Sequence, residues 1–229
     1  MNAIIGYTGF IGGILKKSIL GDYFNSTNIK DIKNKTYNTV YCAGVSSIKW
    51  VANKYPIEDE ININNLLEVL QHVNCNRFIL ISTIGVYDDN PYGINRKKLE
   101  DNLIKTYGNK LLIVRLPAVY GDGLKKNQLF DMLNDSLINK INICDKYQWY
   151  NVNNIKLDID SNLNCEKNIV EFFTEPITNE QLISLFNKDF VVVDDIENAY
   201  IQNKIPKQGY LYSSNKVLKD LKKFIDGYR

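Results

Sequence analysis

The sequence predicts an α/β fold in which a doubly wound parallel sheet is followed by a small C-terminal lobe. Short apolar runs alternate with segments of helical periodicity from the start of the chain to about Gly123. The first apolar run leads directly into a turn with three glycines. Strands that alternate with helices favour a parallel sheet covered on both faces. Beyond Gly123 the pattern changes, and shorter helical and strand-like pieces follow.

Five apolar or β-branched runs are the expected strands of the sheet. They are Ala3–Ile5, "DYFNS", "NTVYCAG", "NRFILIST" and "KLLIVRLPAVYG". Residues 57–73 and 92–107 carry apolar side chains at helical spacing and are the expected covering helices. In the lobe we expect helices over "LFDMLNDSLI", "ITNEQLISLF" and "SNKVLKDLKKFIDGY", and strands over "YQWYNVNNI" and "FVVVDD".

The glycine turn is the first candidate functional site. Gly6, Gly9 and Gly12 follow the first strand and open a helix. Glycine lets the backbone turn sharply and approach a pyrophosphate, and a helix N-terminus offers free N–H groups to an anion. The spacing G-x-x-G-x-x-G differs from G-x-G-x-x-G, but the position after the first strand is the context that motif requires. The turn predicts a dinucleotide site in a Rossmann-type sheet, and a plain tight turn is the alternative.

Composition excludes several classes of protein. The 229 residues contain 28 basic and 26 acidic side chains, a balance that favours neither nucleic acid nor an anionic membrane as partner. The apolar runs are far shorter than the ~20 residues of a membrane-spanning helix, and we expect a cytoplasmic protein. The four cysteines form no C-x-x-C pair and there is one histidine, so we expect no metal site.

Six landmarks in order resemble the extended short-chain dehydrogenase/reductase superfamily, in the branch of NAD-dependent epimerases and dehydratases that act on nucleotide sugars. They are "GYTGFIG", "VYCAG", "ISTIGVY", "YGINR", "RLPAVYGDG" and "YQWYNVNNI". The likeness covers most of the chain. It implies a dinucleotide-binding core over residues 1–123 and a small substrate lobe over 124–229, interleaved with the last core elements.

The resemblance implies a catalytic role for Thr83, Tyr92 and Arg96. In this family a tyrosine gives or takes a proton at a sugar oxygen, and a nearby cation favours its phenolate. Arg96 lies one helical turn after Tyr92, where the family has lysine. A guanidinium supplies charge and hydrogen bonds but cannot lose a proton, which excludes a proton relay through it. Lys97 lies about 100° around the helix and points elsewhere.

A second departure from the family is the short connection between Thr83 and Tyr92, which predicts a more open pocket. The alternative for Tyr92 and Arg96 is that they are ordinary surface residues, and for Thr83 that it is a β-branched strand residue. The family's dehydratases use an acidic pair soon after the threonine, where this chain has Ile84 and Gly85. A dehydratase is therefore disfavoured.

Cofactor contacts are implied by the same resemblance. The second strand ends in Asn25 and Ser26 in place of the acidic residue typical of NAD-preferring members, and Lys30 follows. These residues favour NADP(H) slightly over NAD(H), and a polar turn without cofactor contact is the alternative. The full set of cofactor-binding residues is Gly6, Thr8, Gly9, Phe10, Ile11, Gly12, Asn25, Ser26, Ala43, Gly44 and Pro117.

Substrate contacts are expected after the fifth strand. Lys125 and Lys126 are placed to meet a diphosphate, and Asn127 to bond a sugar or phosphate oxygen. A solvated basic turn is the alternative. Trp149 and Tyr150 either stack on a base or sugar or fill the core of the lobe, and the core is the favoured interpretation.

The function that these residues predict is an NAD(P)(H)-dependent oxidoreductase or epimerase for a nucleotide-linked sugar, such as a 4-keto-sugar reductase in surface-polysaccharide synthesis. The alternative is a non-catalytic dinucleotide sensor of the same superfamily, suggested by Arg96 and the short loop. The resemblance also implies a homodimer that pairs helices 57–73 and 92–107.

Overall fold

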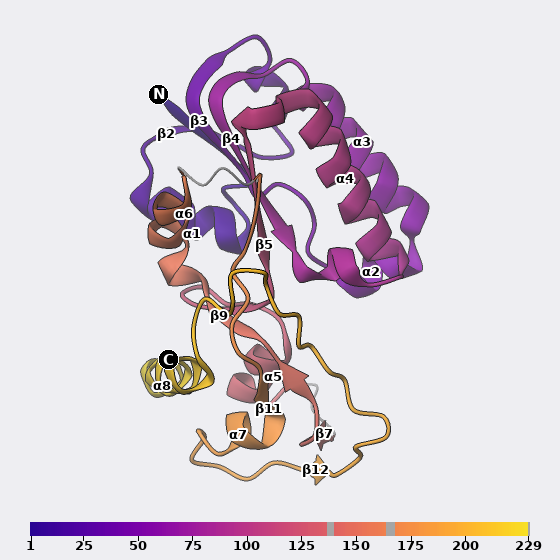
Figure 1. The fold of residues 1–229 in the computed structure, drawn as a ribbon, viewed down its shortest axis with the longest axis vertical. Helices are drawn as coiled ribbons and strands as arrows, with labels where there is room; N and C mark the ends of the chain where they lie inside the picture. Colours follow the sequence, from indigo (N-terminus) through magenta and orange to yellow (C-terminus); the bar gives the residue numbers. More distant parts are fainter. Residues whose placement is uncertain (137–139, 164–167, 229) are drawn as a thin grey trace. The chain divides into compact units, whose positions relative to one another are not determined.

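The computed structural model describes residues 1–136, 140–163 and 168–228 and divides the chain into two compact units. Unit 1 contains residues 1–115 and 154–170, and unit 2 contains residues 116–153 and 171–229. The chain therefore leaves unit 1 after the fifth strand and returns to it once (Figure 1). Each unit is described by itself.

Unit 1 is built on a six-stranded parallel sheet with the order β10-β5-β4-β3-β1-β2. The strands are β1 (Asn2–Ile5), β2 (Gly21–Phe24), β3 (Thr36–Cys42), β4 (Asn74–Thr83), β5 (Leu111–Leu116) and β10 (Ile169–Glu171). The register aligns Ile5 of β1 with Phe24 and with Cys42, so three strands end at the same edge. Cys42 is in turn aligned with Leu80 of β4. The first four strands confirm the sequence prediction, whereas the expected fifth strand, "KLLIVRLPAVYG", divides into β5 and a separate strand, β6 (Ala118–Tyr120), in unit 2.

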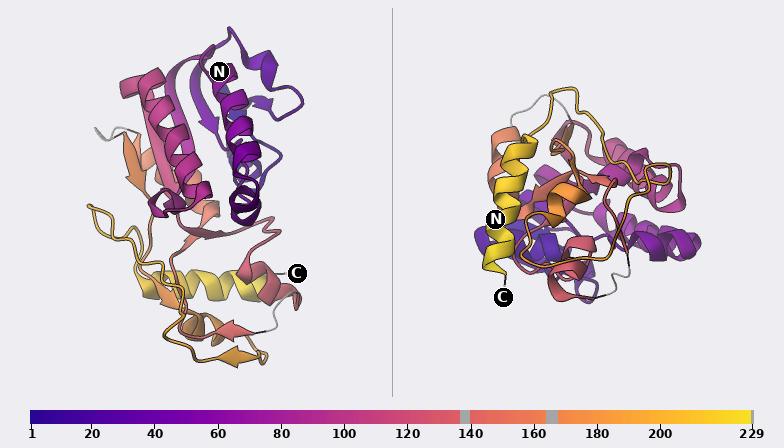
Figure 2. Two further views of the ribbon diagram at one scale, coloured as in Figure 1. Left: turned by 90° about the vertical axis from the view of Figure 1, so that its right-hand side faces the viewer. Right: turned by 90° about the horizontal axis from the view of Figure 1, so that it is seen from below.

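Helices cover both faces of this sheet, as the alternating pattern predicts. Helices α1 (Phe10–Ser18) and α6 (Ile155–Asn162) lie together on one side, and α3 (Pro56–Leu70) and α4 (Pro91–Tyr107) lie on the other (Figure 1). Figure 2 shows α3 and α4 running side by side. Strands β1, β4 and β5 carry buried apolar side chains at consecutive positions, and therefore on both faces, so the helices on each side have an apolar surface to pack against.

The core under α3 and α4 is continuous from helix to sheet. Leu70 of α3 and Leu99 and Leu103 of α4 belong to one buried cluster with strand residues such as Ile5 and Phe78. Each of these five side chains is almost inaccessible to solvent. Burying an aliphatic or aromatic side chain contributes ~1.5–3 kcal/mol, so this layer is the main apolar anchor of α3 and α4.

Helix α6 begins at Ile155, the last residue of "YQWYNVNNI", where the resemblance implies the start of a helix. Two elements of unit 1 were not predicted. The first is the short helix α2 (Lys49–Lys54), which precedes α3. The second is the sixth strand, β10. With three residues it is too short to show a period of two, and it reaches β5 only after the chain has passed through unit 2.

Unit 2 combines short helices with three two-stranded pairs. Its helices are α5 (Gln128–Asn134), α7 (Asn179–Ile183) and α8 (Ser214–Gly227). Its strands pair as β6 (Ala118–Tyr120) with β9 (Trp149–Asn151), β8 (Lys146–Tyr147) with β11 (Ile177–Thr178), and β7 (Ile141–Asn142) with β12 (Val192–Val193). The helix expected over 129–138 ends at Asn134, and residues 137–139 lie outside the described residues.

The close contact between β1 and α1 gives a stability test with a matched control. A Cβ on Gly12 would lie 2.1 Å from the carbonyl oxygen of Gly6, whereas a Cβ on Gly13 would meet nothing closer than 3.6 Å. We expect Gly12→Ala to lower the free energy of unfolding by roughly 1–3 kcal/mol through overpacking. We expect Gly13→Ala to raise it by roughly 0.5–1 kcal/mol, because alanine restricts the unfolded chain. Urea unfolding of both variants measures the difference, and equal effects would contradict the close approach.

Candidate active site

The glycine turn lies between β1 and α1, and its close backbone contacts leave no room for a Cβ atom at Gly6 or Gly12. Gly6 has φ of +81°, and its N–H donates to the carbonyl oxygen of Phe24 at 2.7 Å. A Cβ on Gly6 would lie 2.4 Å from the carbonyl oxygen of Ala43. Backbone atoms cannot give way at this distance, so both the conformation and the space require glycine.

The open side of the turn faces solvent at the N-terminus of α1. Thr8 and Gly9 are exposed, Phe10 and Ile11 are half-buried, and Gly12 is buried against the turn. The first turn of this nine-residue helix is uncharged, so its N–H groups and dipole meet no competing carboxylate there. This arrangement suits an anion such as a pyrophosphate.

The end of β2 is a self-contained polar turn. The Asn25 side-chain oxygen accepts hydrogen bonds from the backbone N–H and the hydroxyl of Thr27, at 3.0 and 2.7 Å. The Asn28 side chain accepts from the N–H of Asn25 and donates to the carbonyl oxygen of Tyr23. Ser26 is exposed at the tip. Residues 25–28 are all uncharged, so nothing in this turn repels a phosphate.

The end of β3 lies directly beside the glycine turn. The N–H of Ala43 donates to the carbonyl oxygen of Ile5 at 2.9 Å, and Gly44 is exposed. A Cβ on Gly44 would lie 2.8 Å from a methyl group of Ile5. The cofactor-site candidates at Gly6, Gly9, Asn25, Ser26, Ala43 and Gly44 thus share the carboxyl edge of the sheet, where ligands of open α/β sheets bind.

Thr83 and Tyr92 meet around Gly85. Thr83 ends β4, and its hydroxyl oxygen accepts a hydrogen bond from the N–H of Gly85 at 3.0 Å. A Cβ on Gly85 would lie 3.3 Å from that hydroxyl oxygen and 2.8 Å from the Tyr92 ring. Both side chains therefore border the same small space at the end of β4.

Local chemistry explains why Tyr92 lies there. Asn90 caps α4 by accepting the N–H of Gly93 at 3.0 Å, and Pro91 occupies the first helical position. The N–H of Tyr92 donates to the side-chain oxygen of Asn53 at 2.9 Å. The Tyr92 side chain is 7% exposed.

Arg96 is buried and bound to a carboxylate that the sequence did not reveal. It donates to both oxygens of Asp59, from NH1 at 2.8 Å and from NH2 at 3.0 Å. NH2 also donates to the carbonyl oxygen of Ser46 at 2.6 Å. The guanidinium carbon lies 4.5 Å from the centroid of the Tyr92 ring, within the range of a cation–π contact.

The charge of Asp59 is stabilised by its partners. Burial raises the pKa of the Asp59 carboxyl, but hydrogen bonds from Arg96 and Asn95 and the Arg96 charge outweigh burial and hold it below its usual range. One signal in the sequence marks Asp59: it lies four residues before Ile63, on the buried stripe of α3. A carboxylate in an apolar stripe requires a partner.

A second buried ion pair lies one helical turn further along α4, between Glu100 and Arg115. Glu100 of α4 is fully buried and accepts hydrogen bonds from Arg115 of β5 at 3.1 and 2.6 Å and from the hydroxyl of Ser82 at 2.6 Å. Arg115 also donates to the hydroxyl of Tyr87 at 2.7 Å. This network ties α4 to the ends of β4 and β5.

The expected substrate residues lie in unit 2, after β6. Asn127 caps α5 by accepting the N–H of Phe130 at 3.0 Å and donates to the carbonyl oxygen of Val119 at 2.8 Å. Its φ of 143° is rare for any residue other than glycine. Lys125 and Lys126 are exposed beside it, and partial desolvation of its ammonium lowers the pKa of Lys126. Pro117, just before β6, is buried.

Trp149 and Tyr150 are buried in β9, which confirms the prediction that they fill a core. In the described part of the chain, no helix combines the length and the apolar composition needed to cross a membrane. Over the same residues, no group of three or more His, Cys, Asp or Glu side chains is placed to hold a metal ion.

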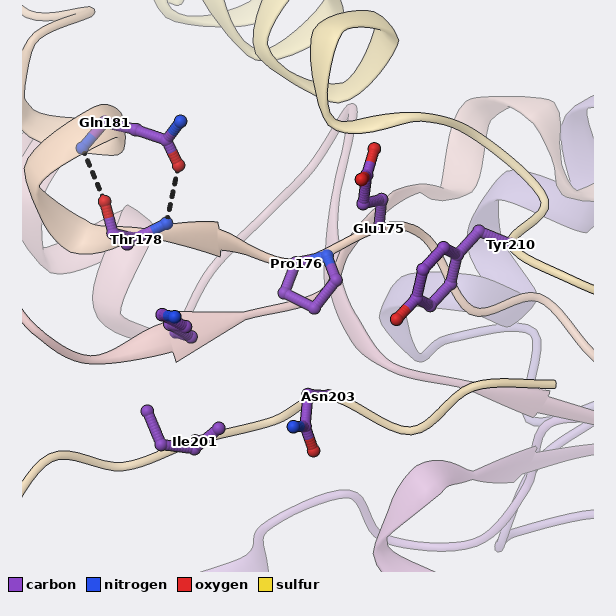
Figure 3. A pocket seen from close by; sticks show the side chains of 8 residues that line it. Glu175, Pro176, Thr178, Gln181, Ile201, Asn203 and Tyr210 are labelled. Carbon is purple, nitrogen blue, oxygen red and sulfur yellow. Dashed lines mark hydrogen bonds between the residues drawn. The ribbon is translucent and has the colours of Figure 1, made fainter.

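Unit 2 also contains a surface pocket of about 330 Å³ that the sequence did not indicate. Thr178 pairs with Lys146 across β11 and β8, and Lys146 forms a bridge with Ile201. Figure 3 shows the two hydrogen bonds between Thr178 and Gln181 at one end of this pocket. The lining residues are Lys146, Glu175, Pro176, Thr178, Gln181, Ile201, Asn203 and Tyr210. They come from segments far apart in the chain, so no local pattern predicts their meeting.

No protein-family model matches the sequence, and no curated protein sequence matches it either. Solved structures do match. UDP-glucose 4-epimerase from Thermotoga maritima has 19% sequence identity and a TM-score of 0.70, and the match covers 100% of this chain and 99% of that chain. dTDP-4-dehydrorhamnose reductase from Bacillus anthracis, in complex with NADP, has 14% identity and a TM-score of 0.72, with the same coverage.

UDP-glucuronic acid 4-epimerase from Bacillus cereus, in complex with UDP-glucuronic acid and NAD, has 17% identity and a TM-score of 0.66 over 100% of both chains. The protein therefore has the same Rossmann-type fold as these nucleotide-sugar epimerases and reductases.

The Asp59–Arg96 pair predicts a pH dependence of stability. Because the folded-state pKa of Asp59 is lower than that of an unfolded aspartate, ~3.9, the pair contributes fully at higher pH. Its contribution is lost as the pH falls below about 4 towards the folded-state pKa. We expect Asp59→Asn to reduce the free energy of unfolding by roughly 3–5 kcal/mol at neutral pH, since it leaves a buried guanidinium without its counter-charge.

The measurement is urea unfolding between pH 3 and pH 6. The difference between wild type and Asp59→Asn should shrink at the acid end of this range. Glu60→Gln is the control, because Glu60 forms an exposed ion pair with Lys98 between the same two helices. If the free energy of unfolding of wild type and of Asp59→Asn changed with pH in parallel, the Asp59 charge would not stabilise the fold.

Proposed function

We propose that the protein is an NAD(P)(H)-dependent oxidoreductase or epimerase that acts on a nucleotide-linked sugar. The observation that carries the proposal is the placement of Thr83 and Tyr92 around Gly85, at the carboxyl edge of the parallel sheet that also carries the glycine turn. The names of the structurally similar enzymes support the reaction class, and two of them contain NADP or NAD.

The residues of unit 1 fit a dinucleotide. Backbone close to Gly6 and Gly12 leaves no room for a Cβ, while Thr8 and Gly9 face solvent at the start of α1. In our proposal this turn and the N–H groups of α1 bind the pyrophosphate, and Ala43 and Gly44 leave room for the adenosine. The uncharged turn of Asn25 and Ser26 supports NADP(H), because it accepts a 2′-phosphate without repulsion. When bound, the nicotinamide supplies or accepts the hydride.

The catalytic roles follow from the geometry around Tyr92. Its hydroxyl gives or takes the proton at a sugar oxygen, and the Thr83 hydroxyl donates a hydrogen bond to the same oxygen. Arg96 holds a fixed positive charge against the Tyr92 ring and, as a guanidinium, does not exchange a proton. In unit 2, Lys125 and Lys126 are candidate contacts for a diphosphate, and the two hydrogen bonds of the Asn127 side chain hold this basic turn despite its strained backbone.

The cofactor site is tested by Gly9→Val. A Cβ on Gly9 would lie 3.3 Å from the carbonyl oxygen of Gly6, an approach that a small shift accommodates, but the valine methyl groups would occupy the space in front of the α1 N–H groups. We expect binding of NADPH and NADH to weaken by about a hundredfold or more, with little loss of thermal stability. Fluorescence titration of both nucleotides measures the change. Unchanged affinity for both would remove the dinucleotide site from this turn.

Catalysis is tested by Tyr92→Phe. With a panel of nucleotide-linked keto-sugars and NADPH or NADH, wild type should oxidise the reduced cofactor in the presence of one of them. Tyr92→Phe should lower the rate by about 100-fold or more and leave cofactor affinity unchanged. Tyr55→Phe, at an exposed position before α3, is the control. Full turnover by Tyr92→Phe would show that the catalytic assignment is wrong.

A second candidate function is a non-catalytic dinucleotide sensor. It is supported by the hydrogen bonds of Arg96 to Asp59 and Ser46, which direct its NH1 and NH2 groups into the protein. A sensor would bind NADPH or NADH through the glycine turn but show no Tyr92-dependent turnover with any keto-sugar.

We also propose a homodimer formed through α3 and α4. Ile57 and Ile61 of α3 are 69% and 52% exposed and lie one helical turn apart, and Ile94 of α4 is exposed as well. A second copy of the same helices would bury these side chains in a four-helix arrangement.

A further inference from the structure

Both carboxylate oxygens of Asp59 accept hydrogen bonds from Arg96, whose guanidinium lies against the Tyr92 ring. One oxygen lies 2.8 Å from NH1 of Arg96 and the other 3.0 Å from NH2. Asn95 donates to the first of these oxygens at 3.0 Å and to the carbonyl oxygen of Pro56 at 3.1 Å. The side chains of Arg96 and Asp59 are 5% and 9% exposed, so water screens their attraction little.

Two contacts with one carboxylate fix the plane of a guanidinium as well as its place. A third contact, from NH2 to the carbonyl oxygen of Ser46 at 2.6 Å, restrains the same group from another element. In this orientation the guanidinium carbon lies 4.5 Å from the centre of the Tyr92 ring. Helical spacing alone brings Arg96 near Tyr92 but leaves its long side chain free to rotate. The carboxylate of Asp59 removes that freedom.

We propose that Asp59 is a positioning residue for the proton-transfer step, acting through Arg96 on Tyr92; this rests on the proposed function. Asp59 does not touch the reacting atoms. It holds the guanidinium carbon 4.5 Å from the centre of the Tyr92 ring and so fixes both the cation and the direction of the tyrosine side chain. Small displacements of a catalytic group are costly, and a shift of ~1 Å can cost about a hundredfold in rate.

The chain offers a matched control on the same two helices. Glu60 and Lys98 also join α3 to α4, with 2.8 Å between carboxylate and ammonium, but both side chains are about half exposed. Glu60→Gln breaks an ion pair between these helices without touching Arg96. Any effect that follows from loosened helix packing would appear in both Glu60→Gln and Asp59→Asn.

The kinetic experiment compares four variants of the full chain. Asp59→Asn should lower kcat by about tenfold to a hundredfold, with KM for the keto-sugar and affinity for NADPH within about twofold of wild type. Asp59→Glu should recover part of kcat, and Glu60→Gln should match wild type. The double variant Asp59→Leu with Arg96→Met replaces the pair by apolar groups and should regain wild-type thermal stability. If kcat returns together with stability in the double variant, the pair is structural and the proposal fails.

A second readout needs no activity. With 3-fluorotyrosine incorporated, the fluorine signal of Tyr92 is assigned by its loss in Tyr92→Phe. Asp59→Asn should shift this signal, and Glu60→Gln should leave it in place. If the signal shifts but no substrate turns over in wild type, the proposed function fails and the positioning of Tyr92 by Asp59 stands. If the signal is the same in Asp59→Asn and wild type, the positioning proposal is overturned whatever the activity.

Discussion

Helix α4 is held by two buried ion pairs, and the candidate catalytic cluster depends on both. Tyr92, Arg96 and Glu100 follow one another at intervals of four residues and therefore lie along one face of the helix. Arg96 is paired with Asp59 of α3, and Glu100 with Arg115 of β5. Removing one partner of such a pair costs about 3–5 kcal/mol, because the other charge stays buried. The pairs thus fix the rotation of α4 and, with it, the place of Tyr92 beside Thr83.

Close backbone packing fixes the conformation of the glycine turn, whereas ion pairs fix the position of α4. Gly6 and Gly12 lie so close to backbone oxygens that a Cβ would fall at 2.4 and 2.1 Å from them. The two constraints act at the same edge of the sheet, because parallel strands end together: Gly6 follows β1, Ala43 follows β3 and Thr83 ends β4. The proposed cofactor site and the proposed proton-transfer site thus share one edge of the sheet, which is the arrangement that hydride chemistry requires.

Strong local patterns made most of unit 1 predictable from sequence. The strands β1, β3, β4 and β5 are apolar runs, and α3 and α4 have long helical periodicity, so each element shows its own signal. Strand β10 has three residues and pairs with β5 only after an excursion through unit 2, which no local pattern records. The same limit applies to the site. The tight glycine turn is contiguous in the sequence and was predicted, whereas the contact between Asp59 and Arg96 joins residues 37 positions apart and was not.

The pairing of Arg96 also determines where unit 1 can attract an anionic ligand. Arg96 is neutralised by Asp59, Arg115 by Glu100, and the ammonium of Lys49 lies 2.7 Å from the carboxylate of Asp88. A lysine at position 96 would give a compact charge able to reach outward, but an arginine bound at two points to Asp59 keeps its charge inside the protein. In our proposal the N–H groups and dipole at the start of α1, whose first turn is uncharged, attract the pyrophosphate. Asp59 therefore keeps the Arg96 charge beside Tyr92, and the proposed pyrophosphate site depends on the backbone N–H groups of α1.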